Sequence, residues 1–305
     1  MSRHIEFRRI ADATLADPIT LFRDALQAIY GPFDCLPIPD GNIHRFHIPG
    51  DKPGNLNGWY LLFANGIAAG CFGSWKAGRV HTWSSRKPAN HLEAQLIAQR
   101  IKQARNQREA EQHQRQQAAA VEALRLWNAG APADADHPYL TRKGNKPHIL
   151  RQHGDVLLVP LYLGRQLVNL QRIHPDGGKR FLSGGMVKGC YSPLGIITAG
   201  QPLYVCEGWA TGATIHAETG AAVACAMNAG NLLGVGQCLQ RQRPDAVLIV
   251  AGDDDRQTEG NPGRTSAIKT AATLGCGLVF PPWSGAEPLE LSDFNDLHQW
   301  RKTNT

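Results

Sequence analysis

Two stretches of sequence decide the fold: Leu-Tyr-Val-Cys-Glu-Gly at residues 203–208 and Ala-Val-Leu-Ile-Val-Ala-Gly-Asp-Asp-Asp at residues 246–255. Each is a short apolar run that ends in acidic residues, which predicts two buried strands of an open α/β sheet. Ligands bind at the carboxyl ends of such strands, so we expect Glu207, Asp253 and Asp255 to lie close together. Carboxylates that share a site repel each other, and a divalent cation relieves the repulsion. The sequence therefore predicts a Mg²⁺ or Mn²⁺ site, of a kind that commonly handles phosphates.

The composition favours a cytoplasmic protein of two or three domains, 305 residues long. Its seven cysteines include no Cys-x-x-Cys pair, which argues against a disulfide framework and favours a reducing compartment. Residues 1–10 contain three arginines and no apolar run follows them, so we expect no signal peptide. A membrane span needs roughly 18 apolar residues in a row, and no segment has them. We therefore predict a soluble protein.

The net charge of +6 is unevenly distributed along the chain. Residues 76–151 contain 14 Lys and Arg against 6 Asp and Glu, whereas residues 201–305 contain 7 against 11. A basic part joined to an acidic, metal-binding part suits an enzyme that handles a polyanion. Long helices are also often basic and solvated, so the charge alone leaves both interpretations open.

Residues 1–87 are predicted to form a small α+β domain. A helix over 18–29 precedes strands over 59–64, 67–72 and 80–83, with Asn65-Gly66 as a tight hairpin turn. The aromatic residues of this region are interspersed with cations, so they either stack bases or form the core of the sheet: Trp59, Tyr60, Phe63, Phe72, Trp75 and Trp83.

Residues 88–130 are predicted to be a helical connector, because no Gly or Pro interrupts them between Pro88 and Gly130. The segment is either one helix of about 60 Å, at about 1.5 Å per residue, or two stacked helices. Apolar residues recur at helical spacing near both ends and lapse over 106–117, so we expect an exposed middle. The recurring positions are Leu92, Leu96, Ile97, Ile101, Val121, Leu124 and Trp127.

The remaining chain changes its pattern near residue 200. Residues 131–200 read as a basic α+β subdomain with strands over 156–163, 167–173 and 181–182. Residues 201–305 alternate apolar strands with helices over 209–218 and 265–274. That alternation predicts an α/β domain, a parallel sheet flanked by helices.

Three acidic motifs in order resemble the Toprim family of primases, topoisomerases and nucleases. They are Glu207-Gly208 after one strand, Asp253-Asp254-Asp255 after another, and Ser-Asp-Phe-Asn-Asp-Leu at residues 292–297. The resemblance implies that Glu207, Asp253 and Asp255 are the catalytic residues and the first ligands of Mg²⁺ or Mn²⁺. It also implies that Asp293 and Asp296 place a second ion or its waters.

A narrower resemblance, to plasmid- and phage-encoded DNA primases, covers most of the chain. It rests on His-Pro-Tyr-Leu at 137–140, Lys143-Gly144, and the stretches 159–161, 170–173, 178–185 and 261–264. It implies a basic subdomain before the Toprim sheet, a template-binding role for residues 1–87, and single-stranded DNA, ribonucleoside triphosphates and a replicative helicase as partners. The residues expected to hold nucleotide or template are Arg172, Lys179, Arg180, Lys188 and Arg264.

The sequence also departs from bacterial primases. Those enzymes carry an aspartate four residues after the motif glutamate, where this chain has Thr211. They begin with a zinc ribbon, whereas here Cys35, His44, His47 and Cys71 lack the paired spacing of a zinc site, so we expect no zinc. A fused helicase motor is not expected either, because the chain has no Walker-type phosphate loop.

The implied reaction is nucleotidyl transfer, in which a 3′-hydroxyl attacks an α-phosphorus while pyrophosphate leaves and two metal ions stabilise both oxygens. Glu207 is either a metal ligand or a base, and the sequence does not separate the two roles. Asp254 should point away from the metal, because alternate residues of an extended segment face opposite ways.

Two alternatives stay open: a metal-dependent nuclease on the same sheet, and a non-catalytic single-strand-binding replication accessory. A topoisomerase would need larger strand-gating domains than this chain can hold.

Overall fold

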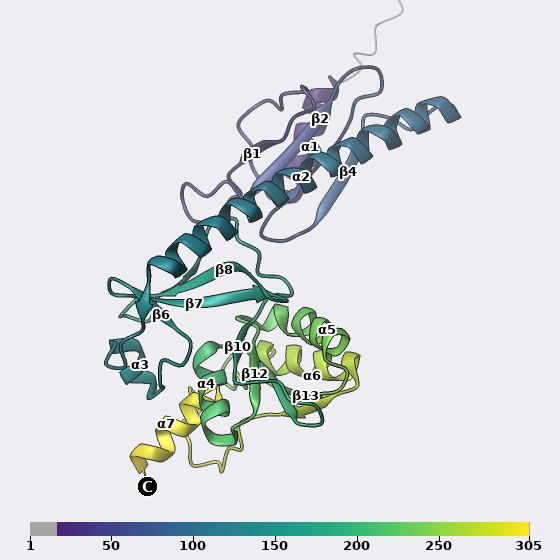
Figure 1. Ribbon diagram of the computed structural model, residues 1–305. Helices are drawn as coiled ribbons and strands as arrows, with labels where there is room; N and C mark the ends of the chain where they lie inside the picture. The colour runs from purple at the N-terminus through teal and green to yellow at the C-terminus, as the bar shows by residue number, and fades with distance from the viewer. Residues whose placement is uncertain (1–16, 305) are drawn as a thin grey trace, which may run out of the picture. The chain divides into compact units, whose positions relative to one another are not determined.

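The structure is a computed structural model that describes residues 17–304, so the signal-peptide prediction at residues 1–10 lies outside the described residues. The chain divides into two compact units, one up to Gln112 and the other from His113. The division falls inside α2 (His91–Ala129), a single uninterrupted helix of 39 residues (Figure 1). Of the two forms that the sequence allowed, the structure adopts the single long helix. No helix in the described part of the chain has the length and apolar composition that crossing a membrane requires.

The first unit is an antiparallel sheet with a helix on each face. Phe22 of α1 packs with Tyr60 and Phe72 on one face, while Ala104 of α2 packs with Trp59 on the other. Neighbouring residues of a strand point to opposite faces, which is why Trp59 and Tyr60 belong to different clusters. The elements are α1 (Pro18–Tyr30), β1 (His44–Phe46), β2 (Gly58–Phe63), β3 (Ala69–Ser74) and β4 (Val80–Ser84), with the strands in the order β1-β2-β3-β4.

The structure decides between the two alternatives for three aromatic residues of this unit, and one expectation is wrong. Trp59, Tyr60 and Phe72 are only 1%, 4% and 3% exposed, so of the two alternatives they form the core of the sheet. The tight turn at residues 65–66 is instead a five-residue loop, because Phe63 pairs with Ala69 across β2 and β3. The side chain of Ile67 is buried within that loop, and burying it requires the longer connection.

The large apolar residues of α2 are not its buried positions. Leu92, Leu96, Val121 and Leu124 recur at helical spacing, yet they are 76%, 42%, 71% and 51% exposed. The buried positions of the helix are alanines instead: Ala104, Ala119 and Ala123. A small side chain lets a helix backbone approach a sheet closely, so close packing outweighs the size of the apolar residue at these positions.

The second unit begins with a meandering antiparallel sheet that packs on both faces. Leu158 and Leu170 pack with Ala123 of α2, while Leu157 and Val159 face the core of the rest of the unit. The elements are β5 (Ala131–Pro132), α3 (Pro138–Lys143), β6 (Arg151–His153), β7 (Val156–Leu163), β8 (Gln166–Ile173) and β9 (Lys179–Phe181), with the strands in chain order. The strand predicted over 156–163 is confirmed at both ends.

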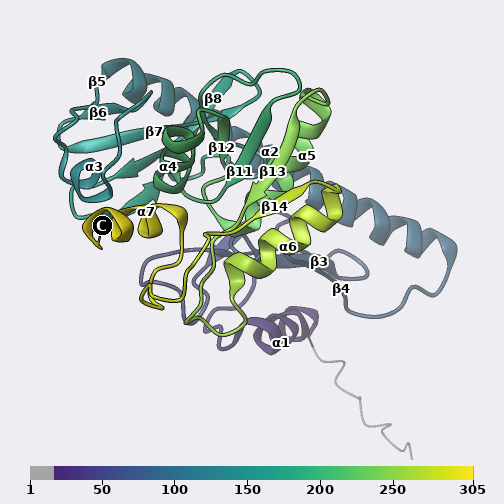
Figure 2. The same cartoon turned by 90° about the horizontal axis from the view of Figure 1, so that it is seen from below.

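The C-terminal sheet is mainly parallel, as predicted, and helices cover both faces. Its strands are β10 (Ser192–Leu194), β11 (Pro202–Cys206), β12 (Ala222–Cys225), β13 (Val247–Ala251) and β14 (Gly277–Val279), in the order β10-β12-β11-β13-β14. Only β10 runs antiparallel. Its helices are α4 (Trp209–Thr219), the short η1 (Ala229–Asn231), α5 (Leu232–Gln242), α6 (Pro262–Leu274) and α7 (Phe294–Asn304). Helices α4 and α7 lie on one face of the sheet, and α5 and α6 lie on the other (Figure 2).

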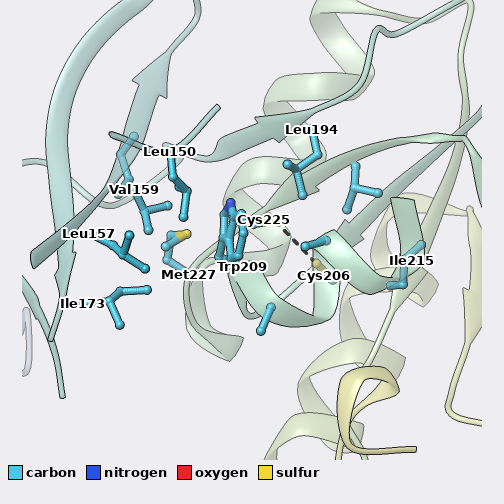
Figure 3. Close-up of a cluster of buried hydrophobic side chains, with 14 of the residues drawn as sticks. Leu150, Leu157, Val159, Ile173, Leu194, Cys206, Trp209, Ile215, Cys225 and Met227 are labelled. Carbon is cyan, nitrogen blue, oxygen red and sulfur yellow. Dashed lines mark hydrogen bonds between the residues drawn. The ribbon is translucent and has the colours of Figure 1, made fainter. Parts of the chain in front are cut away.

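One hydrophobic core joins the meander to the C-terminal sheet (Figure 3). Trp209 and Met227, which follow β11 and β12, pack in the same cluster as Leu157 and Ile173 of the meander. Because this core lies directly beneath the carboxyl ends of β11 and β12, it fixes the meander beside the edge where the predicted carboxylates lie.

Candidate functional site

Five carboxylates gather at the carboxyl edge of the C-terminal sheet. Cys206 at the end of β11 is the register partner of Ala251 at the end of β13, so Glu207 and Asp253 follow adjacent parallel strands at the same edge. Asp255 lies on the same loop as Asp253. The start of α7 brings Asp293 and Asp296 from the end of the chain.

The charges of these side chains are strongly coupled. Burial and then the charges of Glu207, Asp293, Asp255 and Asp296, in that order of effect, together raise the pKa of Asp253 to about 9. Burial and then Asp255 raise the pKa of Glu207 to about 7. The pKa of Asp293 is raised by burial and by Asp296. The sequence thus identified groups that meet in the fold and oppose each other's ionisation.

Glu207 and Asp253 each carry a buried oxygen without a hydrogen-bond partner among the described residues. These atoms are Oε1 of Glu207 and Oδ1 of Asp253. A buried polar atom without a partner is costly, and oxygen donors from carboxylates are the ligands that Mg²⁺ prefers. The donor set therefore fits a divalent cation. As they stand, no three His, Cys, Asp or Glu side chains within residues 17–304 are arranged to hold one ion, so binding requires these carboxylates to turn toward each other.

Asp293 and Asp296 differ from this pair because their oxygens are already hydrogen-bonded. Asp293 caps α7 by accepting from the backbone N–H of Asp296 at 2.8 Å, and its other oxygen accepts from Oγ1 of Thr211 at 3.1 Å. Asp296 accepts from the backbone N–H of Ser292 at 3.2 Å and forms an ion pair with Lys143 at 3.1 Å. Thr211, at the position where bacterial primases have an aspartate, therefore holds Asp293 rather than adding a charge.

Asp254 anchors the loop that leads to α7. Its side chain is buried and accepts from Nδ2 of Asn261 at 2.7 Å and from Nε1 of Trp283 at 3.1 Å. Its backbone N–H donates to the carbonyl of Ser292 at 2.7 Å, immediately before Asp293. The middle residue of the aspartate triplet thus has structural partners of its own, and it fixes where Asp293 lies.

The predicted basic residues fall in different places. Lys179 on β9 belongs to the site: loss of water around its ammonium and the nearby charge of Lys143 lower its pKa, while Asp293 and Asp253 oppose the shift. Arg172 pairs with Arg180 across β8 and β9, and the next pair along the two strands is Ile173 with Lys179. Because successive residues of a strand point to opposite faces, Arg172 and Arg180 face the side of the meander opposite to Lys179. That side is where α2 packs.

The two other predicted cations lie on loops or at a helix start. Arg264 is engaged within the protein, 3.3 Å from Asp254 and with its guanidinium 4.2 Å from the centre of the Phe280 ring. Lys188 is exposed on a loop held by the buried side chain of Asn231. Asn231 accepts from the N–H of Gly189 at 2.7 Å and donates to the carbonyl of Ala226 at 2.8 Å.

Sequence reasoning missed Lys143, Thr211 and Asn231 as residues that organise the site. Lys143 ends α3, and Asp293 and Asp296 raise its pKa even though burial of the ammonium opposes the charge. Lys143 and Asp296 are 153 positions apart, so no local pattern links them. The only available signal was that Lys143-Gly144 belongs to the stretches that resemble primases.

The four side chains considered for zinc do not form a common cluster in the described part of the chain. Cys71 is buried in β3, and burial raises the pKa of its thiol to about 11. Cys35 is exposed, and His44 contacts Asp40 at 2.9 Å. All seven cysteines lie within the described residues and are free.

Comparison with known proteins bears on the C-terminal sheet first. The model of the Toprim domain family matches residues 202–303, which contain all five carboxylates. Residues 202–303 form a Toprim domain.

Two proteins from Escherichia coli, each called DNA primase TraC, are similar to most of the chain. One is 34% identical over 274 residues, covering 84% of this chain and 25% of that protein. The other is 34% identical over 265 residues, covering 82% of this chain and 18% of that protein.

The chain therefore spans about a quarter or less of the length of these relatives. The predicted resemblance to plasmid-type DNA primases with a Toprim domain is confirmed.

Proposed function

We propose that this protein is a DNA primase that synthesises short RNA primers on single-stranded DNA by Mg²⁺-dependent nucleotidyl transfer, in plasmid or phage replication. The observation that carries the proposal is the pair of buried, unpartnered carboxylate oxygens of Glu207 and Asp253 at the carboxyl edge of a Toprim sheet. The similarity to two DNA primases over more than four fifths of the chain supports it. The free cysteines fit a reducing cytoplasm, where we place the reaction.

Each side chain has a proposed role in this reaction. Glu207, Asp253 and Asp255 would hold Mg²⁺, which supplies the positive charge that stabilises the attacking 3′ oxygen and the leaving pyrophosphate. Both oxygens of Asp293 and both of Asp296 already accept hydrogen bonds, whereas Asp255 accepts one from the backbone N–H of Gly263 through Oδ2, so we assign Asp293 and Asp296 to holding the waters around an ion. Glu207 is assigned as a ligand rather than a base, because its unpartnered oxygen needs a cation.

The cations on the two faces of the meander have separate proposed tasks. Lys179, beside the carboxylates, would orient the triphosphate of the incoming nucleotide. Arg172 and Arg180, on the opposite face, would contact template, and the exposed Lys188 would extend that contact. Arg264 is the predicted phosphate ligand with the least freedom, because Asp254 already engages it. A replicative helicase is proposed as a partner on the resemblance alone.

Primer synthesis on single-stranded DNA with labelled ribonucleotides and Mg²⁺ tests the function. We expect short extension products from the wild type and none from Asp253→Asn, which keeps the shape of the side chain and removes a charged ligand. Asp245→Asn is the matched control, because Asp245 lies before the other end of β13 and pairs with Arg243 outside the site. Synthesis by Asp253→Asn at the wild-type rate would refute the proposal.

The same experiment separates the two alternatives. Cleavage of a labelled oligonucleotide without added nucleotides would identify a metal-dependent nuclease. Equal affinity for single strands with and without Mg²⁺, together with no turnover of nucleoside triphosphates, would identify a non-catalytic binding accessory. No observation on this structure favours either alternative over primer synthesis.

A further inference from the structure

A pocket of about 380 Å³ lies between α3 and α7, next to the carboxylates. Its volume falls within the range of small-molecule sites, which is roughly 300–1,000 Å³. The lining combines cations, hydrogen-bonding groups and apolar surface: Arg142, Lys143, Leu291, Gln299, Trp300 and Thr303. The proposed reaction uses Asp296, which also lines the pocket, and none of the other lining residues.

The pocket shares a wall with the site. Lys143 and Asp296 both line it and form an ion pair at 3.1 Å, and the backbone N–H of Asp296 donates to the carboxylate of Asp293 at 2.8 Å, so the ion pair joins the pocket to the carboxylates. A molecule that fills the pocket and extends past Lys143 therefore reaches the edge where Mg²⁺ would bind.

Cations mark the path between the pocket and that edge. Arg142 donates to the carbonyl of Pro175 at 3.2 Å, on the turn that leads into β9 and Lys179. Lys143 comes next in α3, and Tyr139 of the same helix has the guanidinium of Arg142 at 5.9 Å and the ammonium of Lys179 at 5.5 Å from the centre of its ring. Like charges crowded in this way are relieved by a polyanion, and a triphosphate laid along them would have its phosphates beside the carboxylates.

The far end of such a molecule would lie against Trp300. The indole of Trp300 and the side chain of Leu291 offer apolar surface, while Gln299 and Thr303 offer polar groups, and Nε2 of Gln299 is fixed by its bond to the carbonyl of Lys143 at 2.9 Å. A nucleobase has a flat apolar face and a polar edge, and stacking on an aromatic ring accepts any base. We propose that the pocket between α3 and α7 binds the base of the ribonucleoside triphosphate. This inference rests on the proposed function for the direction in which the triphosphate lies.

The test is calorimetric binding of ATP, and separately of inorganic tripolyphosphate, to the full chain in Mg²⁺ without template. Trp300→Leu keeps apolar bulk and removes the ring, so it should weaken ATP binding at least about 5-fold, since stacking of one base on an aromatic side chain contributes about 1–3 kcal/mol. Binding of tripolyphosphate, which has no base, should stay unchanged. Trp300→Phe keeps a ring and should restore most of the ATP affinity.

Three outcomes would overturn the inference: wild-type ATP affinity in Trp300→Leu, equal loss of ATP and tripolyphosphate binding, or equal loss in Trp300→Leu and Trp300→Phe. If Trp300→Leu does not fold, Leu291→Ala on the other wall takes its place; it removes apolar contact with the base, so ATP binding should weaken while tripolyphosphate binding stays unchanged. The assay needs no turnover, so it separates the two proposals. A chain that binds ATP through Trp300 and makes no primers would refute only the proposed function, whereas unchanged ATP affinity alongside primer synthesis would refute only this inference.

Discussion

Asp253 and Asp254 are neighbours in the sequence, but the groups that surround their carboxylates differ in the fold. Asp254 has a neutralising arginine, an indole N–H and an amide N–H around its carboxylate. Asp253 has one buried oxygen without a partner in the described chain and lies among other acids. A charge that is compensated within the protein holds a loop in place, whereas an uncompensated charge favours a proton or a bound cation. The difference separates the structural aspartate of the triplet from the proposed ligand.

The raised pKa values of Asp253 and Glu207 predict how stability depends on pH without metal. Both carboxyls titrate near 4 in an unfolded chain and at about 9 and about 7 in the fold. The fold therefore binds these protons more tightly, and the stability that they contribute is lost as the pH rises from about 4 through 7 to 9. In a chelator, the free energy of unfolding by urea should fall more steeply over this range for the wild type than for Asp253→Asn.

Mg²⁺ should reverse this trend at pH 9, because the ionised carboxylates are the metal-binding form. Parallel pH profiles for the wild type and Asp253→Asn would show that Asp253 is already ionised in the fold. The comparison of the two proteins cancels the titration of the groups that do not interact with Asp253.

At the scale of elements, the packing of α4 on the sheet fixes Glu207. Glu207 lies between β11 and α4, and a methyl group at Gly212 of α4 would clash with the sulfur of Cys225 and lie 3.1 Å from that of Cys206. The two sulfurs are 3.9 Å apart in adjacent strands and fully buried. Glycine is required here by the close approach of helix and sheet, not by its backbone angles.

Gly212→Ala should therefore destabilise the protein. Alanine gains about 1 kcal/mol of helix propensity over glycine, whereas overpacking a close core contact costs about 1–3 kcal/mol, so a net loss of up to about 2 kcal/mol is expected. Gly234→Ala in α5 is the matched control, because the nearest atom to its added methyl is 3.4 Å away. Urea denaturation measures both, and equal effects at the two glycines would contradict the packing argument.

Local patterns account for what could be predicted among the elements. Apolar runs that end in carboxylates predicted β11, β13 and the edge where they end, because strand burial and residue order are local properties. The buried face of α2 was not predictable from residue size, since the close approach of the sheet selects Ala104 and Ala123. Likewise, the local Asn-Gly signal predicted a tight turn, whereas the observed loop is longer and contains the buried side chain of Ile67.

The contacts that complete the candidate site could not be predicted from the sequence, because they join residues far apart in the chain. Lys143 meets Asp296 and Thr211 meets Asp293 across 153 and 82 positions, and only the assembled core brings α3, α4 and α7 together. A lone lysine or threonine has no spacing that distinguishes it from a surface residue.

At the scale of the whole molecule, the similarity to the two primases involves both units. Residues 113–305 are 193 of the 305 residues, less than two thirds, whereas the matches cover 84% and 82% of the chain. The matched region therefore extends into the unit that ends at Gln112 and is not confined to the Toprim domain. We accordingly expect the basic stretch of residues 76–151, which begins in the first unit, and the acidic sheet to serve one activity, with the cations on nucleic acid and the carboxylates on metal.

The central claim is that the buried oxygens Oε1 of Glu207 and Oδ1 of Asp253 lack a partner in the described chain because they hold a divalent cation. Calorimetric titration of the full chain with Mn²⁺, after removal of metals by a chelator, tests it most directly. The account predicts saturable binding by the wild type and by Asp245→Asn, and affinity at least about tenfold lower in Asp253→Asn, since a ligand has been lost. Equal Mn²⁺ affinity in the wild type and Asp253→Asn would contradict it.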